Sequence, residues 1–260
     1  LEAERTVVDP ETEQIISKRK GFPKSLLYDT NKIPVTEDYT TIYTVIKEFN
    51  KDNSESDLHA DDTNIFNSNI RLEIEDGKLN VYDKAKCYKN FIEFVRCNDK
   101  GDSYNFGPVK GDKYETAEIK SAKVVLDGPL RMVLRVKTSF FNVDIMLNKR
   151  SKLINMKFKW LNLLTNKLWQ VKFNLSKPIN EVHSEDMNLL IMRKFDSGYD
   201  IRENLPTKKG IEVKTNTAPM QRFVWTQGCG FITSGLTEYE VKQNSLHITL
   251  LRSTGVISNP

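Results

Sequence analysis

A repeated two-residue alternation of apolar and polar side chains is the feature that most limits how this chain can fold. It is clearest in residues 70–75, where three aliphatic residues alternate with charged ones before the turn sequence Asp76-Gly77. Successive side chains of a β-strand point to opposite faces of a sheet, and Asp-Gly is a strong hairpin signal. The alternation returns in residues 246–250, so we expect His247 to face away from its two aliphatic neighbours.

Strand-like segments fill most of the chain after residue 60, whereas helical spacing is nearly absent. Only residues 185–195 have a spacing that fits one or two helical turns, and they fit a strand equally well. Many strands joined by turns favour two stacked antiparallel sheets. We therefore predict an all-β fold, a large antiparallel β-sandwich with a small N-terminal β-rich segment. The further predicted strands are 79–81, 91–95, 117–126, 130–141, 143–147, 153–163 and 168–175.

The N-terminal region differs in composition from the rest. Its first 38 residues are rich in charge and turn residues, whereas residues 40–49 have the β-branched and aromatic content of a strand. The polar loop that follows, residues 50–62, is the best internal boundary. We expect a linker and small β-module in residues 1–58 and the β-sandwich in residues 59–260. Because the first residue is Leu1, we also expect the chain to be a fragment or a processed form.

Composition excludes several classes of function. With 38% hydrophobic and 28% charged residues the chain resembles an ordinary soluble globular protein. Its 39 basic and 35 acidic residues are interleaved, and Lys18-Arg19-Lys20 is the one basic triplet, so we expect no nucleic-acid partner. No apolar run is long enough for a membrane span, and no signal peptide opens the sequence.

Cysteine usage bears on the compartment and on metal binding. Three cysteines without a Cys-x-x-Cys pair argue against a disulfide scaffold and against a structural zinc site. A reducing cytoplasm fits this usage best.

Four stretches carry a resemblance to a known family. They are residues 64–84, a strand, tight turn and strand ending in Asp-Lys; Gly101-Asp-Ser-Tyr-Asn-Phe-Gly-Pro108; residues 124–131, which end in Gly-Pro-Leu-Arg; and residues 235–255, GLTEYEV followed by ITLLRSTG. In this order they resemble the C-terminal β-domain of the family 38 glycoside hydrolases, the α-mannosidases, and especially their bacterial mannosylglycerate-hydrolase-like branch. The resemblance covers roughly residues 60 to 260 and implies the sandwich of the galactose-mutarotase-like superfamily.

The resemblance also implies what this chain lacks. Family 38 enzymes hydrolyse α-mannosides with retention, which requires two carboxyl groups about 5 Å apart. They also use a zinc ion, and both the carboxylates and the zinc ligands belong to an N-terminal barrel and an adjoining helical region. No segment here matches those regions. We therefore expect no catalytic residue, no metal ligand and no cofactor in this chain, and zinc in the missing catalytic domain.

The three histidines fit that expectation. His59, His183 and His247 lie far apart, without the spacing that holds a metal ion. Each is better explained as a surface histidine or as a hydrogen-bonded structural one.

Two residues carry over from the family as neighbours of the substrate. Tyr104 aligns with a tyrosine that reaches the mannose site, although a loop tyrosine anchored under Pro108 explains it equally well. Arg252 aligns with an arginine whose segment lines the same cleft, and its fork of donors suits sugar hydroxyls or a carboxylate. A structural ion pair with Glu238 or Glu240 is the alternative.

Other candidates have a structural explanation that we favour. Asp102 either stabilises its own turn or accepts a hydrogen bond from a sugar hydroxyl, and the turn role is favoured because aspartate bonds its own backbone readily. Cys229 has no neighbouring histidine, so a buried inert thiol is favoured over a nucleophile. The three tryptophans, Trp160, Trp169 and Trp225, lie in alternating strands and are favoured for the core over sugar stacking.

The sequence thus predicts a non-catalytic C-terminal portion of an α-mannosidase, inactive alone, which braces the catalytic barrel and lines one wall of the mannose site. Its expected partners are the barrel and helical domain of the same polypeptide and a mannoside; a homodimeric parent is left open. One alternative is a free-standing carbohydrate-binding module with an exposed aromatic platform. Another is a mutarotase-like epimerase, which needs a glutamate base and a histidine acid in one cleft.

Overall fold

The computed structural model describes residues 4–8, 15–20, 56–84, 86–104, 106–205 and 214–256. These ranges contain strands, turns and bends but no helix, and so no helix that could cross a membrane. The strands are β1 (Glu4–Val8), β2 (Ile15–Lys20), β3 (His59–Ala60), β4 (Asn64–Phe66), β5 (Ile70–Glu75), β6 (Lys78–Asp83), β7 (Cys87–Asn98), β8 (Glu115–Thr116), β9 (Ile119–Asp127), β10 (Arg131–Thr138), β11 (Asn142–Asn148), β12 (Ile154–Lys159), β13 (Lys167–Asn174), β14 (Glu181–Asp186), β15 (Leu189–Lys194), β16 (Thr217–Pro219), β17 (Phe223–Thr226), β18 (Cys229–Ile232), β19 (Glu238–Lys242) and β20 (Ser245–Ser253).

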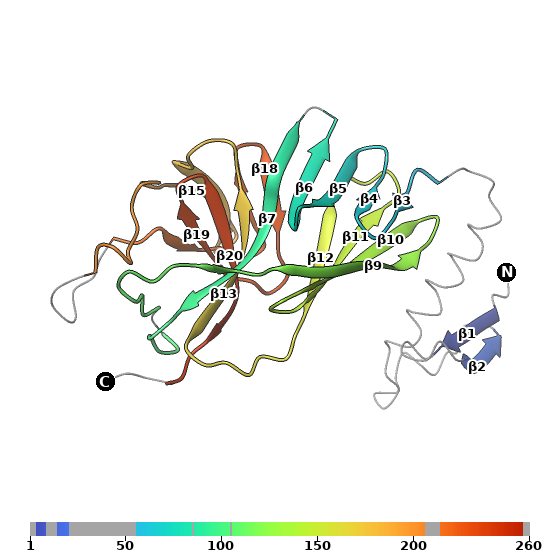
Figure 1. Ribbon diagram of the computed structural model, residues 1–260, viewed down its shortest axis with the longest axis horizontal. Helices are drawn as coiled ribbons and strands as arrows, with labels where there is room; N and C mark the ends of the chain where they lie inside the picture. The colour runs from blue at the N-terminus through green and yellow to red at the C-terminus, as the bar shows by residue number, and fades with distance from the viewer. Residues whose placement is uncertain are drawn as a thin grey trace.

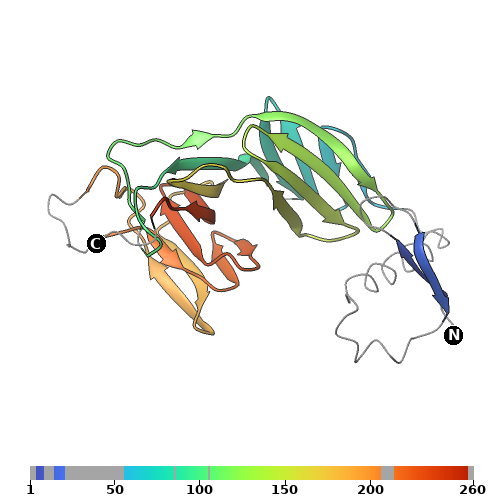
Figure 2. The same ribbon diagram turned by 90° about the horizontal axis from the view of Figure 1, so that it is seen from below.

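One long sheet runs through the described part of the chain from residue 56 onward. It has ten strands in the order β16-β19-β20-β13-β7-β6-β5-β4-β3, with β8 paired to β7 beside this path. Two four-stranded sheets, β12-β11-β10-β9 and β15-β14-β17-β18, form separately. Figure 2 shows β9–β12 lying against the β3–β6 end of the long sheet, and the orange and red strands forming the lobe at its other end.

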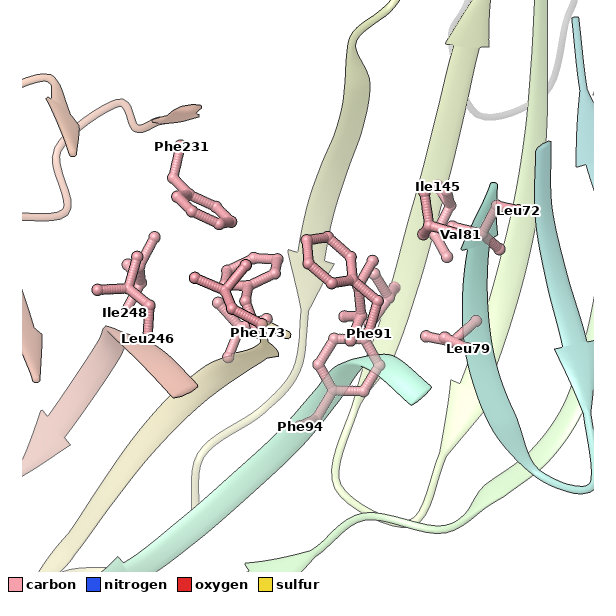
Figure 3. Packing of buried hydrophobic residues seen from close by; sticks show 14 of the residues in the cluster. Leu72, Leu79, Val81, Phe91, Phe94, Ile145, Phe173, Phe231, Leu246 and Ile248 are labelled. Carbon is pink, nitrogen blue, oxygen red and sulfur yellow. The ribbon is translucent and has the colours of Figure 1, made fainter. Parts of the chain in front are cut away.

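The core lies on one face of the long sheet, because register aligns apolar side chains across it. Phe94 of β7 is opposite Val171 of β13, Val171 is opposite Ile248 of β20, and Ile248 is opposite Tyr239 of β19. All four are buried, and side chains opposite one another on one face pack together. In Figure 3 Phe91 and Phe173 occupy the middle of this core, with aliphatic side chains of both lobes on either side.

These observations confirm the predicted all-β antiparallel sandwich. Residues 185–195, for which helix and strand were both open, form the end of β14 and all of β15. The predicted strand 153–163 is shorter than expected: β12 ends at Lys159, and Leu161 and Leu163 are both 81% exposed.

The predicted N-terminal module falls mostly outside the described residues. Within it, β1 and β2 pair as an antiparallel hairpin (Figure 1). The strand expected at residues 40–49 lies outside the described ranges, so the boundary at residue 58 stays a prediction.

Candidate functional site

The loop of residues 99–108, which follows β7, is closed by a single buried aspartate. Asp99 is fully buried, and its Oδ1 accepts hydrogen bonds from the N–H of Gly101 at 2.9 Å and of Gly107 at 2.8 Å. The Lys100 N–H donates to the Gly107 carbonyl oxygen at 2.8 Å, so the two ends of the loop touch. A Cβ on Gly107 would lie 2.1 Å from the Gly101 nitrogen, so only glycine fits this close approach.

Arg252 holds the same loop from the end of β20. Its Nε donates to Asp99 Oδ2 at 2.8 Å, and its Nη2 donates to the Asp102 carbonyl oxygen at 3.0 Å. The arginine side chain is 17% exposed, while that of Asp99 is 0% exposed. A charge-assisted pair in this setting is stronger than a surface ion pair. The guanidinium therefore acts as a brace across the loop.

The ion pair that the sequence suggested for Arg252, with Glu238 or Glu240, is wrong. Glu240 is opposite His247 in the β19–β20 ladder, five residues before Arg252. Glu240 pairs with Arg202 instead, and Glu238 Oε1 accepts a hydrogen bond from the Thr249 hydroxyl at 2.7 Å. The partner of Arg252 is Asp99. Arg252 is opposite Leu168 in β13, and Leu168 is opposite Cys97 in β7, two residues before Asp99.

Tyr104 and Asp102 occupy the outer part of this loop. The Tyr104 N–H donates to Asp102 Oδ1 at 2.9 Å, the short-range bond expected of a turn-forming aspartate. The Asp102 side chain is buried, whereas the Tyr104 side chain is 76% exposed and so does not lie under Pro108. The structure thus brings all three predicted site residues to one loop, with the tyrosine directed to solvent.

A buried polar network adjoins the loop on the face of the long sheet opposite the core. Arg202 is 1% exposed; its Nη1 donates to Glu240 Oε1 and its Nη2 to the Tyr114 hydroxyl oxygen, both at 2.8 Å. The Tyr114 hydroxyl donates to Glu240 Oε2 at 2.7 Å. The ring of Phe106 lies 5.3 Å from Arg202 Cζ and 6.0 Å from Arg252 Cζ, which links the network to the loop.

Charge in this network is fixed by burial and pairing together. Burial opposes ionisation of Glu240, but the adjacent Arg202 guanidinium holds the pKa of that carboxyl below its usual value. Burial raises the pKa of the Tyr114 hydroxyl well above its usual value, and the negative charge of Glu240 adds to the increase. The network is therefore an ion pair with a protonated tyrosine. The Asp200 carboxylate, whose Oδ1 lies 3.3 Å from Arg202 Nη1, extends it to Lys242.

His247 belongs to the same buried layer and is a structural histidine. It is 1% exposed, with Nε2 2.9 Å from the Ser245 hydroxyl and Nδ1 3.2 Å from Gln170 Oε1. Burial lowers the pKa of His247 to about 4, so its ring is neutral at pH 7. The hydrogen-bonded structural role is confirmed for this histidine and the surface alternative is wrong.

The other residues singled out in the sequence lie elsewhere. His183 Nε2 is 3.7 Å from Glu181 Oε1 on the exposed side of β14, and its ring meets the edge of Trp225, which is 44% exposed. Trp169 is buried as expected, and Trp160 is half-buried against the core; the core placement expected for Trp225 is wrong, because its side chain is exposed. Cys229, expected to be buried, is half-buried. No group of three or more histidine, cysteine or acidic side chains within the described ranges could hold a metal ion.

Sequence reasoning missed Asp99 and Arg202, the two residues on which the site's geometry depends. The role of Asp99 could have been predicted from the sequence, since an aspartate two residues before a glycine often accepts a hydrogen bond from the following backbone N–H groups. The role of Arg202 could not: its partner Glu240 lies 38 residues away, and no local pattern marks a buried arginine.

Residues 65–256 match the sequence model of the glycosyl hydrolases family 38 C-terminal domain. The chain belongs to this family. No curated protein matches the chain.

Solved structures share the fold of this family 38 domain. It is similar to the crystal structure of an alpha-mannosidase from Enterococcus faecalis V583, with 18% identity and a TM-score of 0.65 over 79% of this chain and 27% of that one. A second Enterococcus faecalis structure, of a protein in glycosyl hydrolase family 38, gives 17% identity and a TM-score of 0.65 over 79% and 28%. The chain thus spans just over a quarter of the proteins it resembles.

Proposed function

We propose that this chain is the non-catalytic C-terminal portion of a family 38 retaining α-mannosidase of the bacterial mannosylglycerate-hydrolase-like branch. In the intact enzyme it braces the catalytic barrel, and the loop of residues 99–108 forms one wall of the mannose site. The observation that carries this proposal is the braced loop itself. Asp99 and Arg252 fix its backbone while the Tyr104 side chain is left exposed. A rigid backbone with one exposed aromatic hydroxyl suits contact with a ligand held by another part of the protein.

The role of Tyr104 in this proposal is to bind and orient. Its ring offers an apolar face to a sugar, and its hydroxyl donates or accepts one hydrogen bond. Arg252 acts on the substrate through the loop, since its Nε and Nη2 already donate to Asp99 and Asp102. Asp102 contributes to the wall of the site through its backbone, whose carbonyl oxygen accepts the hydrogen bond from Arg252.

The two carboxylates and the zinc of the reaction would come from polypeptide outside this chain. The described residues supply no set of ligands that fits zinc, so no step of the reaction is assigned to them through the metal. A cytoplasmic location is proposed as well, because all three cysteines are free thiols.

Two measurements test the proposal. The isolated chain, given an aryl α-mannoside and zinc, should show no turnover; turnover that depends on its own residues would refute the non-catalytic role. In the full-length enzyme, Tyr104→Phe should lower kcat/KM about tenfold, the value of one lost hydrogen bond of about 1.4 kcal/mol. Tyr82→Phe, in β6 and outside the loop, is the matched control and should leave kcat/KM unchanged.

A free-standing carbohydrate-binding module is the second candidate, favoured by one observation. Trp225 is 44% exposed on β17 and could stack on a sugar. Titration calorimetry of the isolated chain with methyl α-mannoside separates the two. Our proposal expects no measurable heat of binding, whereas binding abolished by Trp225→Ala would support the module. The epimerase has no such support, because His247 is buried and neutral, and His183 meets its carboxylate neighbour Glu181 on the exposed side of β14.

A further inference from the structure

A large apolar cleft lies on the core face of the long sheet, between the two four-stranded sheets. It has a volume of about 1130 Å³ and is lined by aromatic and aliphatic side chains that include Phe91, Phe173, Phe231, Met156 and Leu250. The charged residues that line it are all at least partly exposed, so no buried charge is present to orient a small polar ligand. Its volume is above the usual range for small-molecule pockets, which also need a few convergent polar groups.

Two strand edges border this cleft. β12 is the last strand of one four-stranded sheet and β18 is the last strand of the other, and residues of both line the cleft. Each therefore has a side without a neighbouring strand within the described ranges. Backbone N–H and C=O groups along such an edge are a template for pairing with an added strand.

We propose that an extended strand with alternating apolar side chains, from the part of the parent enzyme outside this chain, fills the cleft and pairs with β12 and β18. The inference rests on the proposed function, and the lengths of the solved relatives support it. This chain covers only 27% and 28% of those structures, so they contain ample further polypeptide. Such a strand would join the two four-stranded sheets into one layer facing the long sheet.

The three cysteines make this proposal measurable. Cys229 lines the cleft and is half-buried, Cys87 is exposed, and Cys97 is buried. Labelling with iodoacetamide, followed by peptide mass analysis, should modify Cys229 in the 1–260 chain. In the full-length enzyme it should do so at least about tenfold more slowly, because access then requires the added strand to open. Cys87 and Cys97 serve as the labelled and unlabelled references.

Amide hydrogen exchange supplies the second measurement. Amides of β12 and β18 that exchange quickly in the 1–260 chain should become protected in the full-length enzyme. Ile232→Lys, at a 74% exposed position of β18 that lines the cleft, should restore Cys229 labelling in the full-length enzyme. Leu126→Lys, at a 43% exposed position of β9 outside the cleft, is the matched control and should leave labelling slow.

Each other outcome overturns the proposal. Equal Cys229 labelling and equal exchange in both proteins would mean that no strand fills the cleft. If Cys229 is labelled slowly in the 1–260 chain and quickly after residues 1–55 are deleted, the segment that fills the cleft belongs to this chain. Slow labelling that rises with protein concentration would make it a second copy. Mannosidase activity of the full-length enzyme tests the proposed function separately, since an active enzyme with an open cleft would refute only this inference.

Discussion

Replacing Asp99 with alanine should destabilise the 1–260 chain far more than replacing an exposed aspartate of a turn. The change removes the acceptor for two backbone N–H groups and the partner of the partly buried Arg252. Hydrogen bonds to a charged acceptor contribute about 1.5–3 kcal/mol, and breaking a buried ion pair costs about 3–5 kcal/mol. Because these terms overlap and Arg252 retains some exposure, we expect a total loss of about 3–5 kcal/mol.

The chain contains a matched control for this change. Asp61 Oδ1 also accepts from two backbone N–H groups, those of Thr63 and Asn64, both at 2.7 Å, but this aspartate is exposed. Asp61→Ala should cost only about 1 kcal/mol, because water replaces the lost acceptor. Urea unfolding at pH 7, followed by tryptophan fluorescence, measures both variants. In thermal melts the Asp99 variant should lose about 10 °C, at roughly 2–4 °C per kcal/mol for a chain of this size.

A double-mutant cycle isolates the brace between Asp99 and Arg252. Asp99→Asn keeps an oxygen that can accept the two N–H bonds but removes the charge, and Arg252→Gln removes the guanidinium. The two changes together should cost less than the sum of the single changes, by about 1.5–3 kcal/mol. If Asp99→Ala costs no more than Asp61→Ala, or if the cycle gives no coupling, the loop is not held as described.

Two further outcomes follow from the same region. Gly107→Ala should lower stability by at least about 2 kcal/mol in urea unfolding, because its Cβ would lie 2.1 Å from the Gly101 nitrogen. Gly198→Ala, where a Cβ would lie 3.6 Å from Asp196 Oδ1 in ordinary contact, should cost less. Folding lowers the pKa of His247 from its ordinary value of 6.5 to about 4. Between pH 4 and pH 6.5 this imidazole therefore binds a proton in the unfolded chain but not in the folded chain. Stability should therefore fall by about 2 kcal/mol from pH 7 to pH 5, and a His247→Gln variant with the same slope would contradict this.

Much of the fold could be predicted from the sequence because its evidence is local. Alternation in residues 70–75 and the turn at Asp76-Gly77 produce the β5–β6 hairpin, whose register pairs Glu75 with Lys78. The order of strands in the long sheet is different, since β7 pairs with β13 and β13 with β20 across many intervening residues. No local pattern encodes those pairings, and so the brace between Asp99 and Arg252, 153 residues apart, could not be predicted.

The position of Arg252 depends on one irregularity in β20 that alternation hides. Continuing the alternation from residue 246 places Arg252 on the same face as Leu246 and Ile248, which is the apolar core face. In the structure the register shifts between Trp169 and Gln170, whose partners are Leu251 and Thr249, so Leu250 is an extra residue in the ladder. A β-bulge of this kind re-aims the side chains that follow it.

The bulge moves Arg252 to the face that carries His247, and this is the face on which Asp99 and its loop lie. A one-residue change of register exchanges the two faces of a strand. Without the bulge the guanidinium would enter the apolar core with no carboxylate partner, at a cost of several kcal/mol. The ion pair and the bulge therefore require each other: the bulge presents the arginine, and the buried Asp99 makes the irregular register the stable one. The wall of the proposed mannose site is thus determined by strand register in β20, remote in sequence from the loop that carries Tyr104.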